Sequence, residues 1–69
     1  MYNRLREARK GRHMTQKQLA AQAGVSQTEI STIETYQITP LLDRAMCIAD
    51  ALGLTAYDIF FLDQPRKKR

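Results

Sequence analysis

The chain has 69 residues, of which 43% are hydrophobic, and it carries a net charge of +4. This length allows one small domain, and the apolar content excludes a chain that is disordered throughout. No stretch reaches the roughly 18 consecutive apolar residues of a membrane span, and the charged N-terminal segment does not resemble a signal peptide. Cys47 is the only cysteine, which excludes an internal disulfide. We therefore expect a cytoplasmic protein in which Cys47 is a small buried group.

Positive charge is concentrated at the two ends of the chain. Residues 1–17 contain six basic residues and one acidic residue, whereas residues 18–63 contain one basic and six acidic residues. Residues 66–69 are all basic. A polyanion would therefore meet the N-terminal helix and the tail rather than the whole surface, although a basic balance can also serve solubility alone. We divide the chain into a domain, residues 1–63, and a basic C-terminal tail, residues 64–69.

The first predicted helix covers residues 2–11. Its inward stripe, at helical spacing, consists of Tyr2, Leu5, Ala8 and Arg9. Gly11 is expected to end the helix, and Met14 is expected to pack inward before the next one. His13 falls in the connection and has neither a second histidine nor a cysteine pair with which to form a metal site. We expect it to be an ordinary loop residue.

Residues 15–34 predict two short helices joined by a tight turn. Each begins with a capping box, formed by Thr15 with Gln18 and by Ser26 with Glu29. Gly24 lies in the turn, where a residue must tolerate positive φ. Apolar residues mark the inner faces: Leu19, Ala20, Ala23, Val25, Ile30 and Ile33. Short polar residues remain on the outer face of the second helix: Gln27, Thr28, Ser31, Thr32 and Thr35.

A fourth helix is predicted from Pro40 to Leu52. Thr39 would cap it, and Pro40 is tolerated at the first helical position. Its inner stripe consists of Leu42, Ala45, Met46, Ile48, Ala49 and Leu52. Gly53 marks its end.

A third capping box, Thr55 with Asp58, predicts a last short helix over residues 56–61. Phe60 and Phe61 are adjacent, so a helix cannot direct both rings to the core. One ring would fill the core while the other would remain exposed. On so small a domain, a ring left exposed would form part of a dimer contact.

The helix–turn–helix segment resembles the Cro/repressor-type (XRE-like) DNA-binding family. The residues that carry the resemblance are Gln16, Leu19, Ala20, Ala23, Gly24, Val25, Ser26, Ile30, Ser31, Ile33 and Glu34, followed by Pro40 and the run Ala49-Asp50-Ala51-Leu52-Gly53. The resemblance covers residues 2–62 and implies an all-α, compact five-helix bundle of the lambda-repressor-like kind, with helices 2 and 3 as the helix-turn-helix. It also implies a sequence-specific DNA-binding transcriptional regulator of a bacterium or its phage, which binds a near-palindromic operator as a homodimer.

In such a protein the second helix of the motif lies in the major groove. The predicted base contacts are Gln27, Thr28, Ser31 and Thr32. Gln27 is long enough to pair with adenine N6 and N7. Because this helix contains no Lys or Arg, the frequent arginine–guanine contact is absent, and readout would favour A·T. Glu29 could accept from a cytosine amino group, but its capping-box role is the stronger expectation.

Phosphate contacts would come from residues around this helix. The family uses a glutamine at the start of helix 2 for the DNA backbone, a role that the resemblance assigns to Gln16. The other candidates are Lys17, Ser26, Lys10 and Arg12, and each basic one can equally be a solvated surface charge. The family also pairs an arginine, here Arg9, with the glutamate that ends helix 3, here Glu34. This implies a partly buried ion pair that connects helix 1 to helix 3.

Tyr36 departs from the family, which usually has a glycine two residues after that glutamate. Either the backbone turns differently at this point or helix 3 extends. The family's basic loop before the proline is replaced by the uncharged residues 37–39. Contacts from a basic loop to phosphate are therefore not expected here, although Tyr36 or Gln37 could supply one.

The sequence contains no catalytic set: no nucleophile with a nearby base, no Gly-rich phosphate loop and no paired carboxylates in an apolar setting. We expect no enzyme activity, no metal, no cofactor, no membrane contact and no small-molecule effector. The expected partners are double-stranded DNA and a second copy of the chain. The alternative function is a protein-interaction module that uses helix 5 and the Phe60–Phe61 end.

Overall fold

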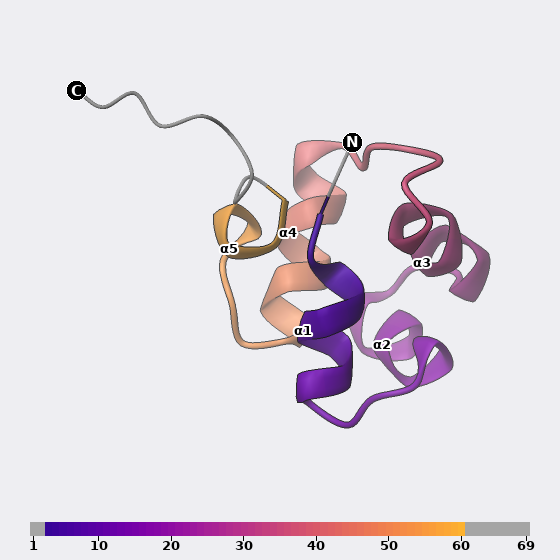
Figure 1. The fold of residues 1–69 in the computed structure, drawn as a ribbon, viewed down its shortest axis with the longest axis vertical. Coiled ribbons are helices and arrows are strands. Elements are labelled where there is room, and N and C mark those ends of the chain that lie inside the picture. Colours follow the sequence, from indigo (N-terminus) through magenta and orange to yellow (C-terminus); the bar gives the residue numbers. More distant parts are fainter. Residues whose placement is uncertain (1–2, 61–69) are drawn as a thin grey trace.

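The computed structural model describes residues 3–60, and this part of the chain is all-helical, as predicted (Figure 1). Its helices are α1 (Leu5–Gly11), α2 (Gln16–Ala23), α3 (Gln27–Glu34), α4 (Leu42–Ala51) and α5 (Ala56–Phe60). The predicted first helix thus begins three residues late, at Leu5, and Tyr2 lies outside the described residues. The motif helices α2 and α3 have the predicted positions.

Helix α4 lies between α5 on one side and the α2–α3 pair on the other (Figure 1). Helix α1 contacts both α3 and α5, so it closes the bundle. The buried apolar core takes side chains from every described helix: Leu5, Leu19, Ala20, Ile30, Ile33, Ala45, Ile48, Ala49, Leu52, Ile59 and Phe60. Met14, Val25 and Ala23 pack against this core from its edge. The motif helices are therefore held in place by the contact of α2 with α4 and by the contact of α3 with α1.

Helix α4 differs from the prediction at its start. It begins at Leu42 instead of Pro40, and Thr39 does not cap it, because the N-cap position is Leu41, which offers no side-chain acceptor. Asp43 provides part of the missing cap, since its carboxylate accepts from the Arg44 backbone N–H at 2.8 Å. An acidic residue in the first turn also suits the positive end of the helix dipole.

Two residues of the predicted inner stripe of α4 are solvent-exposed. Leu42 is 64% exposed and Met46 is 53% exposed, whereas Ile48, Ala49 and Leu52 are buried. At about 100° per residue, Leu42 and Met46 lie on the flank of the stripe that the buried residues define. Cys47, expected to be buried, is also exposed, because it projects from the outer face of the same helix.

Left-handed backbone follows the ends of four described helices, at His13, Gly24, Tyr36 and Gly53, with φ of 58°, 75°, 65° and 72°. After α1 the hydrogen bonds are His13 N to Lys10 O and Met14 N to Arg9 O, at 2.9 and 3.2 Å. This is the Schellman arrangement, in which a left-handed residue satisfies the last helical carbonyls. Helix α1 ends at Gly11, as predicted, and the left-handed residue of the turn is His13.

Candidate nucleic-acid interface

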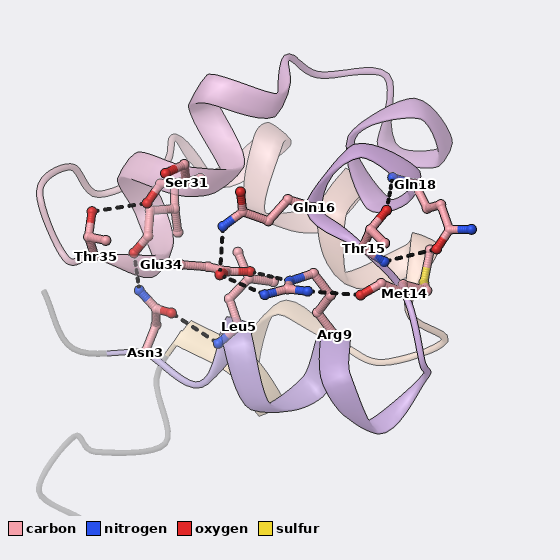
Figure 2. A network of polar contacts seen from close by, with 11 residues as sticks. Asn3, Leu5, Arg9, Met14, Thr15, Gln16, Gln18, Ser31, Glu34 and Thr35 are labelled. Atoms are coloured by element: carbon pink, nitrogen blue, oxygen red, sulfur yellow. Dashed lines mark hydrogen bonds and ion pairs between the residues drawn. The ribbon is translucent and has the colours of Figure 1, made fainter.

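The first helix of the motif starts with the complete capping box that was predicted. The Gln18 backbone N–H donates to Thr15 Oγ1 at 3.0 Å, and the Thr15 backbone N–H donates to Gln18 Oε1 at 2.9 Å (Figure 2). Gly24 ends this helix in the left-handed conformation. These two local features fix the length of α2 and the direction in which the chain enters the turn.

The second capping box is only half formed. The Glu29 backbone N–H donates to Ser26 Oγ at 3.0 Å, but the Glu29 carboxylate does not return to Ser26. It accepts instead from Arg44 Nη1 of α4 at 2.9 Å. The prediction of a reciprocal box at Ser26 and Glu29 is therefore wrong, because a cation from a neighbouring helix competes with the local backbone donor.

The outer face of α3 presents polar side chains of unequal availability. Gln27 and Thr28 are exposed, while Ser31 and Thr32 are half-buried. The Thr32 hydroxyl donates to the Thr28 and Glu29 carbonyls, both at 3.0 Å. Among the described residues, the Gln27 amide and the Thr28 hydroxyl take part in no hydrogen bond. The first turn of α3 therefore offers the polar groups that are open to a new partner.

Arg9 and Glu34 form the expected ion pair between α1 and α3. Arg9 Nε donates to Glu34 Oε2 at 2.6 Å and Arg9 Nη2 donates to Glu34 Oε1 at 3.1 Å, a bidentate arrangement (Figure 2). Their side chains are 10% and 3% exposed. Arg9 Nη1 also donates to the Met14 carbonyl at 2.8 Å. The guanidinium thus joins α1, the α1–α2 connection and the end of α3.

Gln16 belongs to the same network. Its amide Nε2 donates to Glu34 Oε1 at 3.1 Å, and the side chain is partly buried (Figure 2). An amide nitrogen has two hydrogens, so one remains for another acceptor. The network accordingly fixes the orientation of Gln16 at the first residue of α2.

Asn3 is a structural residue that the sequence analysis missed. It is 4% exposed. Its Nδ2 donates to the Ile33 carbonyl at 2.9 Å, and its Oδ1 accepts from the Leu5 backbone N–H at 3.0 Å (Figure 2). Asn3 therefore supports the start of α1 and the last turn of α3 at once. The sequence signal was an asparagine, a preferred capping residue, just ahead of the first apolar position.

The basic candidates for phosphate contact have different surroundings. Lys10 and Lys17 are exposed, as is Ser26. The guanidinium of Arg12 lies over Gly53, where an added Cβ would be only 3.0 Å from its Nη2. Arg12 therefore lies at the carboxyl end of α4, where a cation interacts favourably with the helix dipole.

The turn after α3 keeps the left-handed conformation although its residue is Tyr36. The Tyr36 N–H donates to the Ile33 carbonyl at 3.0 Å, and the Gln37 N–H donates to the Thr32 carbonyl at 2.9 Å. The turn is therefore a full Schellman motif with a tyrosine where glycine is usual. Both expected alternatives, a different turn and a longer helix, are wrong. Exposed apolar side chains follow in the loop and the start of α4: Ile38, Leu41, Leu42 and Met46.

Phe60 is the ring that fills the core, with 1% of its surface exposed. Of the two rings considered for a dimer contact, Phe60 and Phe61, Phe60 is therefore excluded, because it is enclosed by its own chain. Phe61 lies outside the described residues, as does the basic tail. A cavity of about 400 Å³ lies between α1 and α5, lined by Arg4, Glu7, Ala8, Leu54, Asp58 and Ile59. None of these residues belongs to the predicted DNA-contacting set.

Within residues 3–60, no group of three or more potential metal ligands comes together. No helix of this part is both long enough and apolar enough to cross a bilayer. Hydrogen bonds from the Thr55 backbone N–H and hydroxyl lower the pKa of the Asp58 carboxyl. These are the bonds of the third capping box, which is present as predicted.

The fold and the motif together define a helix-turn-helix protein. The chain belongs to the HTH_3 helix-turn-helix family, whose model matches residues 5–59, and this confirms the resemblance to the XRE-like family. Comparison with curated protein sequences gave no match. Two of the similar solved structures are described as a transcription factor and as a transcriptional regulator.

Three solved structures show the same fold. A hypothetical transcription factor, NHTF, from Neisseria is 30% identical, with a TM-score of 0.76 over 81% of this chain and 64% of that chain. An HTH_3 family transcriptional regulator from Vibrio cholerae is 27% identical, with a TM-score of 0.78 over 90% of this chain and 34% of that one. The SinR protein/SinI protein complex gives 24% identity and a TM-score of 0.78 over 88% and 58%. The present chain thus spans less than two thirds of each of these chains.

Proposed function

We propose that this protein is a sequence-specific transcriptional regulator that inserts α3, its recognition helix, into the major groove of DNA. The observation that carries the proposal is the first turn of α3, where the side chains of Gln27 and Thr28 are exposed and form no hydrogen bond within the described chain. A helix-turn-helix places this turn nearest the base edges. Ser31 and Thr32, one turn further on, would read bases or the groove wall.

Gln16 is the leading candidate for a phosphate contact. Its side chain is already oriented by Glu34 and retains one N–H. It lies at the first turn of α2, where the free backbone amides and the positive helix end favour a phosphate group. The remaining candidates are Lys17, Ser26 and Lys10, all exposed, and Arg12, which would have to leave its position over Gly53.

We further propose that the protein binds a near-palindromic operator as a homodimer, as the family usually does. Two copies would then read half-sites about one helical turn apart. Phe60 is unavailable for this contact. Sedimentation velocity with and without a duplex carrying the selected site measures the stoichiometry: two chains per site support the proposal, and one chain per site contradicts it.

The test of DNA recognition is a fragment selection followed by titration of the selected duplex and of a random duplex. Binding should weaken steeply between two salt concentrations, because each neutralised phosphate releases about 0.9 counterions. Gln27→Ala with Thr28→Ala should remove the preference for the selected site while leaving the helical content and the melting temperature unchanged. A preference that survives this double substitution in a folded protein would show that α3 is not the reading element.

The alternative, a protein-interaction module at helix 5 and the Phe60–Phe61 end, could not use Ile59 or Phe60, because both side chains face the core. If the protein binds the random duplex and the selected duplex equally weakly at low salt, the proposal of DNA recognition fails.

A further inference from the structure

The recognition helix carries two carboxylates and no basic residue of its own. Glu34 is paired with Arg9 of α1 in the protein interior. Glu29 is paired with Arg44 of α4, whose Nη1 lies 2.9 Å from Glu29 Oε1. Each negative charge of α3 is therefore balanced by an arginine from a different neighbouring helix.

The Arg44–Glu29 pair differs from the buried pair in its exposure. The side chains of Arg44 and Glu29 are 47% and 22% exposed, against 10% and 3% for Arg9 and Glu34. An exposed ion pair adds little to folding stability. Its main effect is on the charge that the surface presents, and Glu29 directly follows Thr28 in the first turn of α3.

A free carboxylate in this position would have two consequences on DNA. It would repel the nearby phosphates, which carry one negative charge per roughly 1.7 Å of duplex. It would also be an acceptor suited to the cytosine amino group. Arg44 is the one basic residue between positions 18 and 63, so within that stretch no other residue can balance Glu29.

We propose that Arg44 is a positioning residue for base readout: it holds the Glu29 carboxylate toward α4 and cancels its charge, so that the first turn of α3 reads bases through Gln27 and Thr28 and does not read cytosine through Glu29. This inference rests on the proposed DNA recognition by α3. It assigns to α4 a part in specificity although Arg44 itself contacts no base.

The test compares the wild type, Arg44→Met, Glu29→Gln and the double variant by fragment selection and by titration at two salt concentrations. Arg44→Met should weaken binding to the wild-type site by about threefold to tenfold at low salt, because an uncompensated charge then faces the duplex. It should also enrich cytosine at one position of the selected site. Glu29→Gln should suppress both effects, so that the double variant binds like Glu29→Gln alone.

Arg4→Met provides the matched control. Arg4, the N-cap residue of α1, forms an exposed ion pair with Glu7 at 2.8 Å, so this variant also frees one surface carboxylate, but away from α3. It should leave the base preference unchanged. Circular dichroism melts confirm that each variant is folded at the titration temperature.

Three outcomes would contradict the inference. If Arg44→Met weakens binding equally with Glu29 and with Gln at position 29, and lowers the salt dependence by about 0.9 counterions, Arg44 contacts a phosphate directly. If Arg44→Met changes neither affinity nor base preference, while the wild type still needs Gln27 for its site, the inference alone is wrong. A wild type that selects no site overturns the proposed function and this inference together.

Discussion

Arg9 is a charged residue at the boundary of the core. Its guanidinium makes a bidentate pair with Glu34 and a third bond to the Met14 carbonyl, and the residue is 9% exposed. A buried charge is tolerated when every donor has a partner. The position of α3 relative to α1 therefore depends on a polar contact as well as on apolar packing.

Arg9→Ala should lower the free energy of unfolding by about 3–5 kcal/mol, because Glu34 would remain buried without its cation. Urea denaturation measures the change. Arg6→Ala, in the same helix but at an exposed position, is the control and should have an effect within about 0.5 kcal/mol. Equal stabilities for the two variants would show that the ion pair does not hold α1 to α3.

Tyr36 is held in a conformation that costs an ordinary residue about 1–2 kcal/mol relative to glycine. The Schellman hydrogen bonds to Ile33 and Thr32 maintain it. Backbone strain often occurs at functional sites. Tyr36 lies directly after the recognition helix, in the loop that leads to α4.

Tyr36→Gly should raise the melting temperature by a few degrees, because about 1 kcal/mol of backbone strain is relieved. Differential scanning calorimetry measures the shift. Tyr36→Ala is the control, since it removes the same ring and its contacts without relieving the strain, and it should not stabilise. If glycine and alanine have the same effect, strain at φ 65° is not significant.

At the scale of single elements, capping decides where these short helices begin. Helices of five to ten residues are marginal in isolation, and α2 and α5 each start with a complete box. Helix α3 has a half box, because Glu29 is drawn to Arg44. Helix α4 has no side-chain cap at its N-cap residue, and its start is supported by packing and by Asp43.

Asp58 makes the contribution of the α5 capping box to folding stability dependent on pH. Its pKa is lowered from 3.8 in the folded chain by the two bonds from Thr55, so the unfolded state binds the proton more tightly. The resulting stabilisation is fully present above the unfolded pKa, near 3.8, and is lost as the pH falls through the lower folded pKa.

Asp58→Asn should therefore reduce the melting temperature slightly at pH 7, and the difference from the wild type should shrink below about pH 4. Melts at several pH values from 7 to 2.5 measure it. Asp50→Asn, at an exposed position in α4, is the control. A difference that stays constant across this range would mean that the Asp58 charge is not the cause.

At the scale of the whole molecule, small residues on α4 allow the other helices to approach it. Ala45 and Ala49 are buried between larger side chains, whereas Leu42 and Met46 on the flank of the same helix meet no neighbour that covers them. The same helix thus carries a filled core face and an apolar flank open to solvent.

Ile48→Ala should lower the free energy of unfolding by about 2–5 kcal/mol, because it creates a cavity at a fully buried site. Leu42→Ala, also a loss of large apolar volume in α4, is the matched variant and should cost less than about 1 kcal/mol. Chemical denaturation separates the two. Comparable losses would mean that Leu42 is packed in solution.

The sequence by itself determined the features that depend on residues close in the chain. Capping spacing located α2, α3 and α5, and apolar periodicity placed Leu19, Ile30, Ile33 and Ile48 in the core. The Arg9–Glu34 pair followed from the family resemblance rather than from spacing. Local hydrogen bonds and helical periodicity act over about one turn, so the order of the residues is sufficient to predict them.

Only the tertiary structure decided the features that depend on which helices meet. These include the burial of Phe60, the exposure of Leu42, the Arg44 partner of Glu29 and the Asn3 bond to Ile33. Each joins or separates groups distant in the chain, and for Glu29 the competing local contact with Ser26 was physically reasonable. Long-range packing chose between them because a short helix gains more from neighbouring helices than from its own termini.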